Sequence, residues 1–124
     1  MPHLKHEIHR AITRFLDCFI RNDTAQLLAE FGIAPERLDE LNETVYACIT
    51  ADKSELGLFP IAQINQRSQS NRANLSIAPL TQLSGVYNVE CDLWLRGEPF
   101  EAVLVADYDT TAPACKLEVR YISV

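Results

Sequence analysis

The chain has 124 residues, a formal net charge of −6 and a hydrophobic content of 48%. This length and apolar content predict a single domain over residues 1–124, with a core large enough to fold without disulfides or metals. No apolar run approaches the ~18 residues that a membrane-spanning helix needs, and the first residues lack a secretory pattern. We therefore expect a cytoplasmic protein that does not enter membranes. Its acidic charge repels phosphate backbones, which argues against a nucleic acid partner.

The first half of the chain has helical periodicity. Residues 3–21 carry apolar side chains at spacings of three and four, which predicts an amphipathic helix. Asp23 and Gln26 have the spacing of a capping box, so a second helix should begin at Thr24 and end near Gly32. Pro35 suits the first position of a third helix that continues to about residue 49. Residues 51–74 give mixed signals: a short helix after Pro60 and an isolated strand are the two alternatives, and we assign neither.

From residue 75 onward the apolar period changes to two, which predicts strands at 87–95, 100–108 and 115–122. A further strand over 75–83 would lie at a sheet edge or carry a bulge, because Pro79 cannot donate a ladder hydrogen bond. The expected fold is therefore α+β, with three N-terminal helices packed on one face of a curved antiparallel sheet of three to four C-terminal strands.

The strand pairing can be predicted from charge and turn chemistry. A two-residue turn after Leu95 would place Asp92 opposite Glu101 and bring a proline into the ladder, so a four-residue loop over 96–99 is favoured. That register pairs Cys91 with Leu104.

The same register pairs Tyr87 with Tyr108 and Leu95 with Phe100. In the second hairpin, a loop over 109–114 would pair Asp107 with Lys116. Arg120 then becomes the expected partner of Asp92 on the outer face of the sheet.

The segment Arg21-Asn22-Asp23-Thr24-Ala25-Gln26-Leu27-Leu28-Ala29-Glu30-Phe31, following a long amphipathic helix, resembles the helix-turn-helix opening of nuclear-transport-factor-2-like domains. The three long C-terminal strands are similar to that family's curved sheet, whereas residues 51–74 depart from its pattern. A cystatin-like or other helix-on-sheet arrangement is the alternative. The resemblance implies a cone-shaped pocket between sheet and helices. Such folds host isomerases, dehydratases, small-molecule binders and dimerisation modules, so the fold does not fix the function.

Strand alternation places three tyrosines on the inner face of the sheet: Tyr87, Tyr108 and Tyr121. They are candidate residues for binding a small, largely apolar ligand, or else core rings whose hydroxyls reach the rim. The predicted inner face carries no Asp, Glu or His, so we assign no catalytic residue. An isomerase-like or dehydratase-like enzyme would need a buried acid or base that this alternation misses.

The same alternation places four large apolar side chains on the outer face: Trp94, Val103, Val105 and Ile122. A homodimer formed through the outer sheet face would cover them, whereas a plain solvated face is the alternative. A third possibility is an acidic inhibitor or immunity-type protein that binds a basic partner through Asp39, Glu40 and Glu43. The favoured prediction is a non-catalytic ligand-binding or dimerisation module.

No metal or cofactor is expected. His3, His6 and His9 form an H-x-x-H-x-x-H pattern, but neighbouring histidines at a fraying helix end fall short of the three or four ligands that zinc requires. Phosphate-binding loops and hydrolase motifs are absent from the sequence. The four cysteines are far apart and fall on apolar faces, so we expect buried free thiols: Cys18, Cys48, Cys91 and Cys115.

Overall fold

The computed structural model describes residues 2–49, 52–66, 73–111 and 115–123, with side chains from residue 4 onward. Three helices precede an antiparallel sheet, which confirms the predicted α+β fold class. The helices are α1 (Pro2–Ile20), α2 (Thr24–Phe31) and α3 (Pro35–Cys48). The strands are β1 (Leu56–Gly57), β2 (Leu75–Pro79), β3 (Val86–Leu95), β4 (Glu98–Asp109) and β5 (Lys116–Ser123). Among the described residues, no helix has the length and apolarity to cross a membrane.

Local chemistry sets the helix ends where the sequence predicts them. The Asp23 carboxylate accepts a hydrogen bond of 3.1 Å from the backbone N–H of Gln26, which caps the start of α2. Gly32 ends this helix in the left-handed conformation at φ 66°, where a residue without a Cβ is favoured. Pro35 opens α3. These caps make the helical half of the fold readable from short stretches of sequence.

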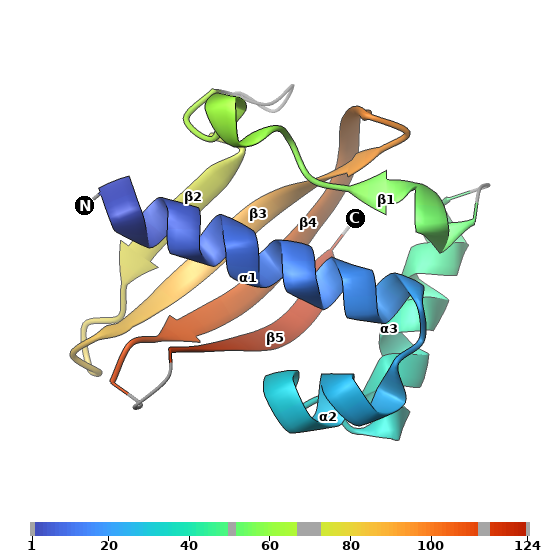
Figure 1. The fold of residues 1–124 in the computed structure, drawn as a ribbon, viewed down its shortest axis with the longest axis horizontal. Helices are drawn as coiled ribbons and strands as arrows, with labels where there is room; N and C mark the ends of the chain where they lie inside the picture. The colour runs from blue at the N-terminus through green and yellow to red at the C-terminus, as the bar shows by residue number, and fades with distance from the viewer. Residues whose placement is uncertain (1, 50–51, 67–72, 112–114, 124) are drawn as a thin grey trace.

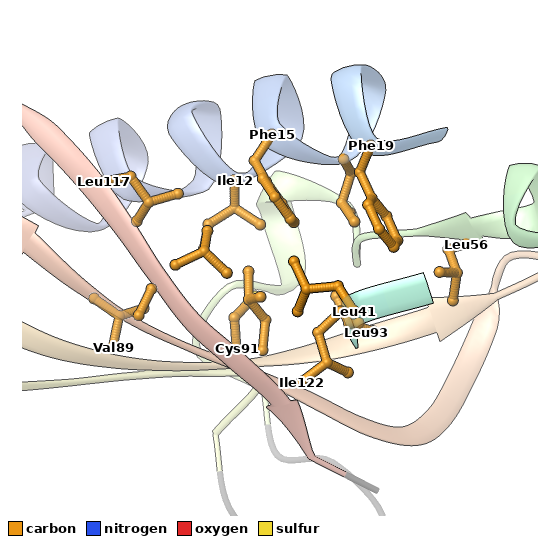
Figure 2. Close-up of a cluster of buried hydrophobic side chains, with 14 of the residues drawn as sticks. Ile12, Phe15, Phe19, Leu41, Leu56, Val89, Cys91, Leu93, Leu117 and Ile122 are labelled. Atoms are coloured by element: carbon orange, nitrogen blue, oxygen red, sulfur yellow. The ribbon is translucent and has the colours of Figure 1, made fainter. Parts of the chain in front are cut away.

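The core lies between α1 and the sheet. Helix α1 crosses one face of the sheet, and α2 and α3 pack beside β5 (Figure 1). Ile12, Phe15 and Phe19 point from α1 toward Cys91 and Leu93 of β3 (Figure 2). Burial of each such large side chain contributes about 1.5–3 kcal/mol to folding. These side chains form the core between α1 and the middle of the sheet.

The sheet has the order β1-β3-β4-β5, and β2 also pairs with β3. The predicted pairing of Cys91 with Leu104 and of Tyr87 with Tyr108 is confirmed. The predicted pairing of Leu95 with Phe100 and the predicted four-residue loop are wrong, because the hairpin turns through only two residues and Leu95 pairs with Glu98. Arg96 and Gly97 form this turn with φ of 54° and 75°, the positive angles that two-residue hairpin turns require.

An irregularity in β4 reconciles the short turn with the confirmed register. Trp94 pairs with Pro99, whereas Asp92 pairs with Val103, so three β4 residues lie opposite the single β3 residue between them. Asp92 is thereby kept from facing Glu101 directly. The like-charge contact is avoided by extra residues in the strand and not by a longer loop.

The predicted β4–β5 register is also wrong. Lys116 pairs with Asp109 instead of Asp107, and Asp107 faces Glu118. One extra β5 residue, Arg120, then interrupts the ladder between the pairs that Val119 and Tyr121 form with β4. This bulge reverses the inward and outward alternation for the rest of the strand.

The bulge overturns two predicted side-chain orientations. Tyr121, expected on the inner face, is 53% exposed on the outside, and Ile122, expected outside, is 4% exposed in the core. Figure 2 shows Ile122 among the core side chains below α1. Arg120 pairs with Asp107 rather than with the predicted Asp92. Arg37 of α3 donates hydrogen bonds to the carbonyl oxygens of Val119 and Arg120, which ties the bulge to the helices.

The described parts of residues 51–74, to which the sequence assigned nothing, contain β1 and two short 3₁₀ turns at Lys53–Glu55 and Ile61–Gln63. Lys53 is 3% exposed. Its Nζ donates to Oδ1 of Asn22 at 2.6 Å and Oδ1 of Asn42 at 2.7 Å, and lies 4.2 Å from the centre of the Phe19 ring. Burial lowers the pKa of this lysine. The ammonium group thus joins the segment to the α1–α2 turn and to α3.

Candidate functional site

A cavity of about 230 Å³ opens beside α1, where the end of α2 meets the last part of β4 and the first part of β5. Apolar parts of Ala11, Phe31 and Leu117 line it, together with Tyr108. Its charged and thiol-bearing lining residues are Glu7, Arg10, Arg14, Glu30, Cys115 and Lys116. The cavity therefore combines an apolar surface with a cluster of charges drawn from α1, α2 and β5, beside the thiol of Cys115.

Tyr108 is the most deeply buried of the polar residues that line this cavity. It lies on the inner face of β4, opposite Tyr87 on β3 and Leu117 on β5, and is 5% exposed. Burial, reinforced by the neighbouring Cys115 side chain, raises the pKa of Tyr108 to about 12. The phenol therefore stays neutral near pH 7 and offers a hydrogen bond without acting as a base.

The charges around the cavity include three cations, Arg10, Arg14 and Lys116, against the two carboxylates of Glu7 and Glu30. Arg14 donates to Glu30 at 2.7 Å, and this hydrogen bond is the main reason why the pKa of Glu30 is lowered. Within the described ranges, Arg10 and Lys116 form no ion pair. The protein is acidic as a whole, but the residues that line this cavity carry a small excess of positive charge.

The Lys116 side chain lies near the C-terminal end of α2. Its Nζ lies 3.7 Å from the position that a Cβ on Gly32 would occupy. Gly32 caps α2 at its C-terminal end, where the helix dipole attracts a cation. Arg10 and Arg14 lie four residues apart on α1 and so share a helix face.

The structure separates the three predicted ligand-binding tyrosines. Tyr108 lines the cavity, and Tyr87 is half-buried beside it on the inner face without being part of the lining. Tyr121 lies outside because of the β5 bulge. Alternation therefore located one cavity residue and its neighbour, but not the cations. The one sequence signal for the cations is the excess of four basic over two acidic residues among the first 22.

The predicted interface residues offer less surface than expected. Trp94 and Val103 are buried, Val105 is half-buried, and Ile122 belongs to the core. The Trp94 Nε1 atom has no hydrogen-bond partner in the part of the chain that the structure describes. The homodimer stays a prediction, with a smaller apolar surface to support it.

The other candidate groups lie apart. Within residues 2–49, 52–66, 73–111 and 115–123, no three His, Cys, Asp or Glu side chains are grouped as a metal site would require. His6 is exposed, as predicted. His9, expected to be solvated, is half-buried, and its Nε2 donates to the Phe59 carbonyl oxygen at 3.0 Å. Asp39, Glu40 and Glu43 are exposed on α3.

The cysteine prediction is confirmed for Cys18 and Cys91, which are buried free thiols, whereas Cys48 is half-buried. It is wrong for Cys115, which is free and exposed because β5 begins one residue later. Burial raises the pKa of the other three thiols.

Comparison of the chain with protein-family models, curated proteins and solved structures finds no match in any of the three. The resemblance to nuclear-transport-factor-2-like domains therefore stays a prediction.

Proposed function

We propose that the protein is a non-catalytic binding module whose Tyr108 cavity takes a small molecule with one anionic group and an apolar part. The observation that carries this proposal is the joining of an apolar lining to an excess of cations in a chain of net charge −6. Pockets for small molecules typically combine apolar walls with a few placed polar groups. Arg10 and Lys116 would hold the anion, and Phe31 and Leu117 would contact the apolar part.

The size of the cavity limits the ligand. Its volume of about 230 Å³ falls below the roughly 300–1,000 Å³ of pockets that enclose drug-sized molecules. A short aliphatic acid or a single-ring aromatic acid fits this space better than a nucleotide or a sterol. A longer ligand would leave part of its length in solvent.

The ionisation of the lining favours binding over proton transfer. A general acid or base works best with a pKa near the operating pH. The pKa of Tyr108 is raised above its ordinary value, and that of Glu30 is lowered below its own. Both shifts move these groups away from neutrality, so we assign them to recognition and not to catalysis.

The test is an NMR titration of ¹⁵N-labelled protein with octanoate, and with octanol and octylammonium as neutral and cationic analogues of the same chain length. We expect shifts that saturate at the lowest concentration for octanoate and that centre on residues 10–14, 31 and 115–117. An exposed charge pair contributes about 0.2–1 kcal/mol, so Lys116→Gln and Arg10→Gln should each weaken octanoate binding by about 1.5- to 5-fold.

Arg96→Gln is the matched control, because Arg96 pairs with Glu55 outside the cavity lining and its loss changes net charge equally. This variant should bind octanoate like the unmodified protein. Equal weakening by Arg96→Gln, or shifts scattered over the surface, would show that the interaction is a general charge effect and would overturn the proposal.

A further inference from the structure

Cys115 differs from the other three cysteines in access. All four lie in described parts of the chain; Cys18 and Cys91 are buried, Cys48 is half-buried, and Cys115 is exposed. Cys115 also lines the cavity, beside Lys116 and the buried Tyr108. The thiol is therefore held at the mouth of an existing cavity, next to cations.

We infer that Cys115 forms a mixed disulfide with a small anionic disulfide that docks in this cavity. The inference rests on the proposed function, since the same cations that would bind a carboxylate ligand would dock the anionic disulfide. Beyond non-covalent binding, the protein would then form a covalent bond, and Cys115 would be the modified residue. Reactive thiols in proteins are accessible and lie near cations; Cys115 is exposed and lines the cavity with Arg10, Arg14 and Lys116.

The step is a thiol–disulfide exchange. The Cys115 thiolate attacks one sulfur of the bound disulfide, a new bond forms between the Cys115 Sγ and that sulfur, and the original disulfide bond breaks. The departing half leaves as a thiolate and takes a proton from solvent. Cys115 is oxidised and the departing half is reduced, so the disulfide itself is the oxidant.

The neighbours of Cys115 give the reaction its selectivity. Lys116 follows Cys115 in the chain, and Arg10 and Arg14 line the same cavity. A carboxylate on the incoming disulfide can pair with these cations while its sulfur reaches the thiol. A cationic disulfide meets repulsion at the same point. The ring of the buried Tyr108 lines the same cavity beside Cys115.

The test compares three probes on the reduced protein: oxidised glutathione, which is anionic, cystamine, which is cationic, and bis(2-hydroxyethyl) disulfide, which is neutral. Intact mass and peptide mapping follow the adducts with time. We expect one adduct, on Cys115, and a ratio of anionic to cationic probe rates about 3- to 10-fold higher in the folded than in the urea-denatured chain. Lys116→Gln should lower this ratio, and Arg96→Gln should not.

A ratio that is unchanged by unfolding would overturn the inference, as would a first adduct on Cys18, Cys48 or Cys91. Tyr108→Phe should leave the ratio of anionic to cationic probe rates unchanged, because it removes no charge from the cavity. Octanoate titration of Cys115→Ser separates the two proposals. If Cys115→Ser still binds octanoate while the unmodified protein reacts with the three disulfides without selectivity, the covalent step alone is rejected. If octanoate binding and selective disulfide exchange are both absent, the proposed function is rejected as well.

Discussion

Replacement of Lys53 by Met tests whether a buried ammonium group stabilises this fold. The change keeps most of the apolar stem and removes the donor to Asn22 and Asn42 and the contact with the Phe19 ring. Asn22 is exposed and can turn to water, whereas Asn42 is half-buried. One unsatisfied buried oxygen costs about 1–3 kcal/mol, and the lost ring contact about 0.5–2 kcal/mol. Relief of the ammonium's desolvation offsets part of this sum.

The expected net loss in free energy of unfolding is about 1–3 kcal/mol, measured as a shift of about 1 M in the urea midpoint with an unchanged slope. Lys5→Met is the matched control. The Lys5 Nζ donates to Asn65 Oδ1 at 2.6 Å, the same length as the Lys53–Asn22 bond, but at the surface. Its loss should cost less than about 0.5 kcal/mol. If the two substitutions lower the free energy of unfolding equally, burial does not explain the contribution of Lys53.

The pH dependence of the Lys53→Met deficit gives a second, independent check. Burial lowers the pKa of Lys53 in the folded chain below its ordinary value of 10.5. Between these two pKa values the unfolded chain binds more protons at this site than the folded chain, so folded stability rises with pH there. Met carries no such proton, and the deficit of Lys53→Met should grow as pH rises toward 10.5. A deficit that shrinks over this window would contradict the stated effect of burial.

Two further substitutions test the β-sheet end of the molecule. Gly85→Ala would place a Cβ 2.7 Å from Thr111 Cγ2 at φ +82°, whereas Gly57→Ala meets nothing within 4 Å; we expect a urea-measured loss of about 1–3 kcal/mol for the first and little for the second. The raised pKa of Tyr108 favours the folded state below the ordinary tyrosine pKa of 10.0, and this stability is lost as pH rises toward about 12. Tyr108→Phe should remove that loss from the pH–stability curve.

The helices could be predicted because their signals are local. Asp23 caps a helix that begins at the next residue, Gly32 ends it, and Pro35 starts another. Each signal depends on a few neighbouring residues and on backbone chemistry that is the same in any fold. The apolar stripe of α1 likewise needed only its own spacing to indicate the buried face.

The end of β5 could not be predicted, because distant residues decide it. Arg120 is the extra residue of the bulge, and it is held by Asp107, 13 residues away, and by Arg37, 83 residues away. Tyr121 and Ile122 both have large apolar side chains, so the pattern of the strand permits either to face the core. Only the contacts of the bulge select Ile122.

The cavity shows the same division between local and distant information. Strand alternation indicated Tyr108, but Arg10, Glu30 and Lys116 come from α1, α2 and β5 and meet only in the folded chain. Their local charge matters more to a bound anion than the total of −6. At physiological salt the Debye length is about 8 Å, so exposed acids beyond that distance are largely screened. An anion inside the cavity therefore interacts mainly with its lining, where cations outnumber carboxylates, even though the protein as a whole repels it.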